Sequence, residues 1–203
     1  WWRGQNITLD PGTFRYNDPA PWDNPLTSAL YHNTVTIDGR DQFTRVSRFL
    51  YLDRAEATKV KAKAGTLSAR HYAYARRGVR HTRKVSTLTP ERWQVEDELL
   101  NLRGKLHTFR LHWLLPDGDY ELDTSNETIA IKLKLPKGWL NLQIAAPQLS
   151  IAQTSLVRAG DIDPLRGWFS PTYNVKVPAL SLAVEVQSAG NVGFVSEFQF
   201  GNL

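Results

Sequence analysis

The feature that most constrains the fold is an alternation of apolar and polar residues with a period of two, which recurs along most of the chain. In residues 128–135, isoleucine and leucine alternate with polar positions that include Lys132 and Lys134. Residues 57–64 and 106–114 alternate in the same way. Successive side chains of a β-strand point to opposite faces, so each run predicts a strand with one face covered and one in solvent. Further runs are 66–76, 180–186 and 192–200.

Turn-forming residues separate these runs. They are Asp38-Gly39, Arg77-Gly78, Arg103-Gly104, Pro116-Asp117-Gly118, Pro136-Lys137-Gly138 and Ala189-Gly190. No segment predicts an amphipathic helix longer than two turns. Many short strands at this spacing predict an all-β fold, an antiparallel multi-stranded β-sandwich with a smaller second sheet layer at the C-terminus. We expect residues 1–203 to form this one domain, with an internal subdivision near 116–124.

Composition excludes several classes of protein. The chain has 203 residues, of which 41% are hydrophobic and 22% charged, as in an ordinary folded globule. The absence of cysteine excludes disulfides, thiolate metal sites and a cysteine nucleophile. No apolar run approaches the roughly 18 residues of a membrane span, so we expect none. The absence of methionine predicts a piece of a longer protein.

The net charge of +5 and the pI near 9.5 favour an acidic partner. The densest basic group lies in residues 70–84, where Arg70, Arg76 and Arg80 are candidate ligands for a polyanion. Lysine and arginine are also common on solvated strand faces, which is the alternative interpretation. No nucleic-acid-binding motif accompanies the charge, so nucleic acid is not an expected partner.

Two residues near the N-terminus are candidate metal ligands. We expect a first strand at 2–9 and a long ordered loop at 10–25. Asp10 precedes Pro11 and Gly12, which fixes its carboxylate at a strand end, although it could equally cap an Asx-type turn. His32 begins the next expected strand and could equally be a structural histidine. The pair is at most half of a zinc site, which needs three protein ligands or more.

The other histidines provide no recognisable motif. They are His71, His81, His107 and His112. Neither a His-Glu-x-x-His spacing, a phosphate loop nor a nucleophile elbow occurs. We therefore interpret these histidines as structural.

Several segments together resemble the heparinase II/III-like family of bacterial polysaccharide lyases. They are residues 1–17, Pro21-Trp22, residues 32–42, Trp113-Leu114-Leu115-Pro116-Asp117-Gly118 and Gly167-Trp168-Phe169-Ser170-Pro171. The resemblance implies that a β-sandwich follows an N-terminal (α/α) toroid of helices, with the substrate in the cleft between them. It also implies β-elimination on a uronic-acid polysaccharide, with catalytic groups that come largely from the toroid.

The resemblance further implies a metal site. By residue match Asp10 and His32 are two ligands of zinc or a similar divalent cation. The family's third ligand comes from a His-x-His-x-Asp motif, which this sequence does not contain. Metal binding by this chain alone is therefore expected to be weak or absent.

We thus expect the C-terminal domain of a periplasmic or secreted bacterial polysaccharide lyase, inactive by itself, whose catalytic residues are not identified by the sequence. Arg70, Arg76 and Arg80 would line one wall of a cleft for an acidic polysaccharide. The expected partners are the N-terminal helical domain of the same protein and, in a homodimer, a second copy. The alternative is a non-catalytic carbohydrate-binding or structural sandwich, with Trp22, Trp139 or Trp168 as sugar platforms.

Overall fold

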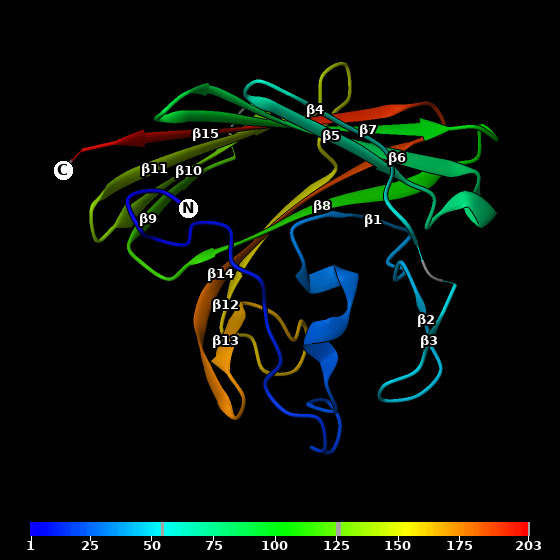
Figure 1. The fold of residues 1–203 in the computed structure, drawn as a ribbon, viewed down its shortest axis with the longest axis horizontal. Helices are drawn as coiled ribbons and strands as arrows, with labels where there is room; N and C mark the ends of the chain where they lie inside the picture. The colour runs from blue at the N-terminus through cyan, green and yellow to red at the C-terminus, as the bar shows by residue number, and fades with distance from the viewer. Residues whose placement is uncertain (54, 125–126, 203) are drawn as a thin grey trace. The chain divides into compact units, whose positions relative to one another are not determined.

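The computed structural model describes residues 1–53, 55–124 and 127–202, and these form an all-β, antiparallel fold (Figure 1). The predicted fold class, an all-β sandwich, is confirmed. One sheet has the order β1 (Val35–Ile37), β8 (His107–Pro116), β14 (Val175–Ser188) and β12 (Gln153–Arg158), and β13 (Trp168–Thr172) also pairs with β14. The described residues contain no helix long and apolar enough to span a membrane.

The second sheet has eight strands. In order they are β4 (Thr58–Lys63), β5 (Thr66–His71), β6 (Val79–Thr89), β7 (Arg92–Asn101), β15 (Val192–Gly201), β11 (Gly138–Ala145), β10 (Thr128–Leu135) and β9 (Tyr120–Asp123). A two-stranded ribbon joins β2 (Thr44–Arg45) to β3 (Tyr51–Leu52). Three single turns of 3-10 helix complete the described elements: η1 (Pro25–Thr27), η2 (Ala29–Tyr31) and η3 (Ala75–Arg77).

The chain divides into two compact units whose segments interleave in the sequence. Unit 1 comprises Trp1–Arg54, Arg110–Asp117 and Gln153–Glu185, and unit 2 comprises Ala55–Phe109, Gly118–Ala152 and Val186–Leu203. The eight-stranded sheet belongs wholly to unit 2, whereas β8 and β14 each contribute residues to both units. One boundary lies between residues 117 and 118, but the expected subdivision into consecutive parts stays a prediction.

On β10 and β11, the eight-stranded sheet has one apolar and one polar face. On β10, Ile129, Ile131, Leu133 and Leu135 are buried while Lys132 and Lys134 are exposed, as the alternation predicts. The apolar residues of β11 pair directly with them: Leu140, Leu142 and Ile144. Paired residues of neighbouring strands point to the same side, so these side chains form one continuous apolar face.

Three local predictions are wrong. Residues 57–64 do not form a strand with a covered face, because β4 is an edge strand on which Val60 is 59% exposed and residues 61–63 are exposed too. Residues 2–9 form only an isolated bridge between Trp2 and Gln5. At the end of this segment, the Leu9 amide donates to the Leu114 carbonyl on β8. The strand expected at 66–76 ends at His71, where the chain turns into η3.

In the five-stranded sheet, both faces of the central strands are buried. Leu180, Leu182 and Val184 alternate on β14 with Ser181 and Ala183, and all five are buried. On β8 the apolar residues Leu111, Trp113 and Leu115 alternate with Arg110 and His112. A hydrogen bond joins His112 to Ser181, so the polar positions of the two strands share one face. The carbonyls of Leu30 and His32 accept hydrogen bonds from Arg110 and His112 on this face, and the candidate site lies beside them.

Candidate functional site

The Asp10 carboxylate is held in position by the turn that follows it. The Gly12 amide donates to Asp10 Oδ1 at 2.9 Å, which is the Asx-type turn considered as an alternative in the sequence. The Leu9 amide anchors the preceding residue by donating to the Leu114 carbonyl at 2.8 Å. Gly12 has a φ of 70°, and a Cβ there would lie 2.2 Å from the Ser170 carbonyl oxygen. Glycine is therefore required at this position. The second carboxylate oxygen, Asp10 Oδ2, takes no part in this hydrogen bond.

That second oxygen faces the His32 imidazole. His32 Nδ1 lies 3.4 Å from Asp10 Oδ2, with 35% of the His32 side chain and 74% of the Asp10 side chain exposed. The other ring nitrogen, Nε2, lies 3.0 Å from the Leu26 carbonyl oxygen. A carbonyl only accepts, so Nε2 carries the proton and, in the neutral ring, Nδ1 presents a lone pair toward the carboxylate. The structure thus brings together the two residues that the sequence singled out.

The donor set of this pair fits a divalent metal. Zinc bonds to nitrogen and oxygen of about 2.0–2.2 Å at a tetrahedral angle separate two ligand atoms by about 3.4 Å. Metal-bound histidines commonly donate their other ring N–H to a carbonyl, as His32 does here. Among residues 1–53, 55–124 and 127–202, no group of three histidine, cysteine, aspartate or glutamate side chains could hold a metal. The pair therefore supplies part of a site, and with a protonated His32 it forms an ion pair instead.

Directly behind His32 is a buried polar row that sequence reasoning missed. His112 is completely buried, and its Nδ1 lies 2.9 Å from the His32 carbonyl oxygen while its Nε2 lies 2.6 Å from Ser181 Oγ. Burial, together with nearby Arg110, holds the pKa of His112 well below its usual range, so the ring is neutral. The signal available in the sequence was the alternation of Thr108, Arg110 and His112 with the large apolar residues Phe109, Leu111 and Trp113.

Two guanidinium groups extend this row. Arg166 donates to Ser181 Oγ at 3.2 Å and to Ser155 Oγ at 2.6 Å, and burial with the charge of Arg110 lowers its pKa to about 10. Arg110 donates to the Leu30 carbonyl at 3.0 Å and lies 3.6 Å from Glu185 Oε1. Burial also raises the pKa of nearby Tyr31, against the charges of both arginines. The row is thus a cationic, hydrogen-bonded support for the segment that carries His32.

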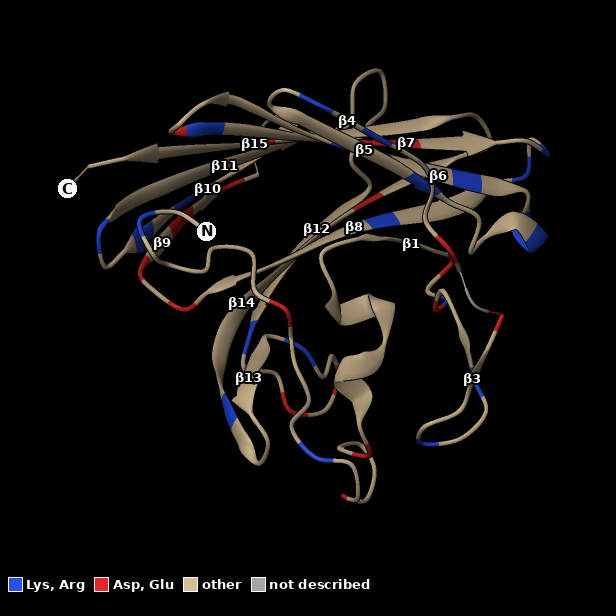
Figure 2. Cartoon of the chain, in the orientation of Figure 1, with Lys and Arg blue, Asp and Glu red and all other residues tan. Residues whose placement is uncertain are grey.

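The residues proposed from sequence as a polyanion surface lie in unit 2. Figure 2 shows basic segments on β6 and on the turn that precedes it. Arg70 and Arg80 share one sheet face, because Arg70 pairs with Thr82 in the β5–β6 register and donates to its hydroxyl at 3.1 Å. Arg76 lies apart on η3, and Arg83 points to the opposite face. Their role in substrate binding stays a prediction.

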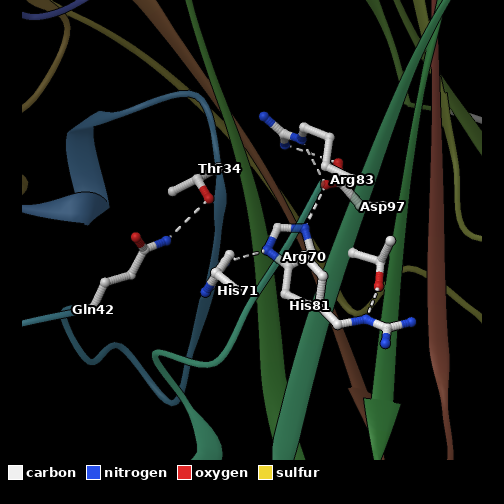
Figure 3. A network of polar contacts seen from close by, with 8 residues as sticks. Thr34, Gln42, Arg70, His71, His81, Arg83 and Asp97 are labelled. Carbon is white, nitrogen blue, oxygen red and sulfur yellow. Dashed lines mark hydrogen bonds and ion pairs between the residues drawn. The ribbon is translucent and has the colours of Figure 1, made fainter. Parts of the chain in front are cut away.

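On that opposite face, a chain of hydrogen bonds links two histidines to a buried carboxylate (Figure 3). His71 Nε2 lies 2.8 Å from His81 Nδ1, and His81 Nε2 lies 2.6 Å from Asp97 Oδ1. Arg83 clamps the same carboxylate with two bonds of 2.7 and 2.9 Å. Burial alone would raise the pKa of Asp97, but Arg83 and His81 lower it to about 2. The charges of Arg83 and Asp97 neutralise each other within the sheet, which indicates a structural role.

A lysine ammonium group lies over the ring of each tryptophan considered as a sugar platform. Lys176 Nζ lies 3.6 Å from the ring centre of Trp22 and 3.9 Å from that of Trp168. Lys132 Nζ lies 4.8 Å from the ring centre of Trp139. The two indoles around Lys176 are set edge to face at 75°, so they do not form a flat platform. This arrangement favours cation–π packing over stacking of a neutral sugar.

Comparison with known proteins gives a consistent family. A family model described as heparinase II/III-like, C-terminal, matches residues 1–195. Among solved structures, the heparinase III BT4657 gene product is 16% identical with a TM-score of 0.74 over 100% of this chain. The heparan sulfate lyase HepC from Pedobacter heparinus is 21% identical with a TM-score of 0.69 over 98% of this chain. This chain spans 29% of the length of each. A search of curated sequences found no significant match.

Proposed function

Because the chain belongs to the heparinase II/III-like family through the family's C-terminal domain, we propose that it is the β-sandwich part of a bacterial polysaccharide lyase that acts on uronic-acid polysaccharides. In β-elimination a base removes the proton next to the uronate carboxylate and an acid protonates the departing glycosidic oxygen. The carboxylate must be neutralised as charge develops. The catalytic groups would lie largely in an N-terminal helical domain of the same protein, and the whole protein would be periplasmic or secreted.

Within this function, the proposed role of the chain is to hold a metal and to form one wall of the substrate cleft. The observation that carries the metal site is the 3.4 Å approach of His32 Nδ1 to Asp10 Oδ2, with His32 Nε2 hydrogen-bonded to Leu26. These two residues would hold zinc or a similar divalent cation, and the third ligand would come from the preceding part of the protein. When bound, such a cation supplies a fixed positive charge and ties the two parts together.

The basic residues provide the second half of the proposal. Arg70 and Arg80, on one face of the eight-stranded sheet, and Arg76, on η3, would attract the acidic polysaccharide. Glu98 faces Thr82, and Glu96 forms a 2.9 Å ion pair with Lys84, so acidic residues share this face and reduce its net charge. We expect these arginines to add modestly and salt-sensitively to substrate affinity rather than to reaction chemistry.

The test of the lyase assignment follows the ultraviolet absorbance of the unsaturated uronate product with heparan sulfate, heparin, alginate and hyaluronan. The chain alone should release no product, because losing a single acid or base already costs about 10²–10⁴-fold in rate. The longer gene product with its preceding domain should release product from one or more of these polymers. Product from the chain alone would contradict the division of roles, and no product from the longer protein would contradict the lyase assignment.

The test of the metal site uses zinc titration of the longer protein against a chromophoric chelator. Asp10→Asn and His32→Gln should each lower zinc affinity at least tenfold. Asp119→Asn removes an exposed carboxylate from unit 2 and serves as the matched control, with no expected change. Equal zinc affinity in all four proteins would refute the ligand assignment.

A further inference from the structure

One amide side chain ties together the two segments that carry Asp10 and His32. Asn33 Nδ2 donates to the Leu9 carbonyl at 2.9 Å, and the Leu114 amide donates to Asn33 Oδ1 at 2.7 Å. Only this orientation of the amide satisfies both partners, because a carbonyl accepts and an N–H donates. Leu9 directly precedes Asp10 and Asn33 directly follows His32. A single side chain thus fixes both backbone segments to each other and to β8.

A second side chain fixes the His32 peptide from the other side. His112 Nδ1 lies 2.9 Å from the His32 carbonyl oxygen and must donate to it. Nε2 of the neutral ring therefore accepts, and Ser181 Oγ donates to it at 2.6 Å. Ser181 Oγ can point its proton at His112 because it receives an N–H from Arg166 at 3.2 Å. The direction of every bond in this chain is determined, and its end point is the backbone of His32.

Together these contacts leave little freedom to the His32 segment. Its carbonyl accepts a second bond, from the Thr34 amide at 2.8 Å, and its imidazole is fixed by the Leu26 carbonyl at 3.0 Å. The His112 amide also donates to the Thr34 carbonyl at 3.1 Å. None of these bonds involves Asp10 or a metal. The direction of His32 Nδ1 toward the carboxylate is therefore set by the protein itself.

We infer that Asn33 and His112 are positioning residues that hold the His32 imidazole and the Asp10 carboxylate at metal-binding separation before a metal is bound. The inference rests on the proposed metal site and deepens it. Partners that orient metal ligands from outside the ligand set typically change metal affinity 10–100-fold when removed. We expect that range for loss of either residue's contact, although neither side chain would touch the metal.

Four variants separate positioning from general destabilisation. Asn33→Asp keeps the bond from Leu114 but sets a carboxylate oxygen against the Leu9 carbonyl. His112→Gln loses the donor to His32, whereas His112→Asn can place its amide N–H where Nδ1 stood. Asn101→Asp is the matched control, because Asn101 also holds backbone segments together through its side-chain amide, which donates to the carbonyls of Lys105 at 2.7 Å and Ala189 at 3.0 Å, but within unit 2.

The first measurement uses the metal-free chain at one neutral pH and records the proton resonance of His32 Nε2–H by NMR. A ring N–H held by a carbonyl exchanges slowly enough to be seen. The resonance should be visible in the wild-type chain and in Asn101→Asp, broadened or lost in Asn33→Asp and His112→Gln, and retained in His112→Asn. Retention of the resonance in both Asn33→Asp and His112→Gln would overturn the inference, whatever the protein does with metal.

The second measurement is a titration with zinc alone of the longer protein that carries the same substitutions. Asn33→Asp and His112→Gln should bind zinc 10–100-fold more weakly than wild type, and Asn101→Asp should bind it equally well. An equal loss in Asn101→Asp would show that destabilisation, not positioning, is responsible. If wild type binds no zinc in the chain or in the longer protein, the proposed metal site fails, and the NMR result decides the positioning of His32 by itself.

Discussion

Replacing His71 by glutamine should reduce the loss of stability that acid causes. In the folded protein the Ala73 amide donates to His71 Nδ1 at 3.3 Å, and His71 Nε2 donates to His81 Nδ1 at 2.8 Å. Both ring nitrogens of neutral His71 therefore already have hydrogen-bond partners. A proton added to His71 Nδ1 would point at the N–H of Ala73. Burial, followed by the neighbouring His81 and Arg83, lowers the pKa of His71 to about 4.

The size of the effect follows from the two pKa values. In the unfolded chain His71 titrates near its ordinary pKa of 6.5 and in the folded chain near 4. The neutral ring is the form that the fold favours, so this stability is complete above pH 6.5 and is lost as the pH falls toward 4. Between pH 7 and pH 5 the unfolded chain takes up most of a proton and the folded chain takes up little, which integrates to about 2 kcal/mol. Because the side chain is partly exposed, about 1–2 kcal/mol is the expected loss.

The assay is urea unfolding of wild type and His71→Gln at pH 7 and pH 5. The fall in the free energy of unfolding between the two pH values should be smaller in the variant by about 1–2 kcal/mol. The buried His112 titrates in both proteins, so its contribution cancels in the comparison. An identical fall in both proteins would refute the argument that the hydrogen-bond chain of Figure 3 excludes the proton from His71.

Three further substitutions probe other parts of the fold. Asp97→Asn should lower the free energy of unfolding by about 3 kcal/mol in a urea titration, because it leaves the Arg83 guanidinium without its carboxylate; an isoenergetic variant would contradict the buried ion pair. Gly12→Ala should lower the melting temperature by several degrees and weaken zinc binding, because its Cβ meets the Ser170 carbonyl at 2.2 Å; normal zinc affinity would disprove the need for this turn. Lys176→Met should lower the free energy of unfolding by about 1–2 kcal/mol, measured by thermal unfolding, because the cation–π contacts with Trp22 and Trp168 are lost. An unchanged melting curve would show that these contacts do not stabilise the fold.

The sequence predicted strands best where each had one apolar and one solvated face. Residues 128–135 met that condition, because β10 lies inside the eight-stranded sheet and its lysines reach solvent. The same alternation misled at 57–64, since β4 is an edge strand and the period of two says nothing about what covers a face. Coverage is a tertiary property, and a local pattern cannot contain it.

For the candidate site, the sequence identified Asp10 and His32 but not the residues that orient them. The resemblance to a family selected the pair, and the geometry then brought their side chains within 3.4 Å. His112 was interpreted only as structural, because its partners, the His32 carbonyl and Ser181, lie 80 and 69 residues away in sequence. Contacts at such separations leave no local spacing to recognise.

The interleaving of the two units has a consequence for how the chain is made. Unit 1 needs segments that extend from residue 1 to residue 185, and unit 2 needs segments from residue 55 to residue 203. During synthesis, which proceeds from the N-terminus at about 5–20 residues per second, the Asp10–His32 segment emerges long before Ser181 and the rest of its support. The candidate metal ligands are thus made well before the residues that give them their final geometry.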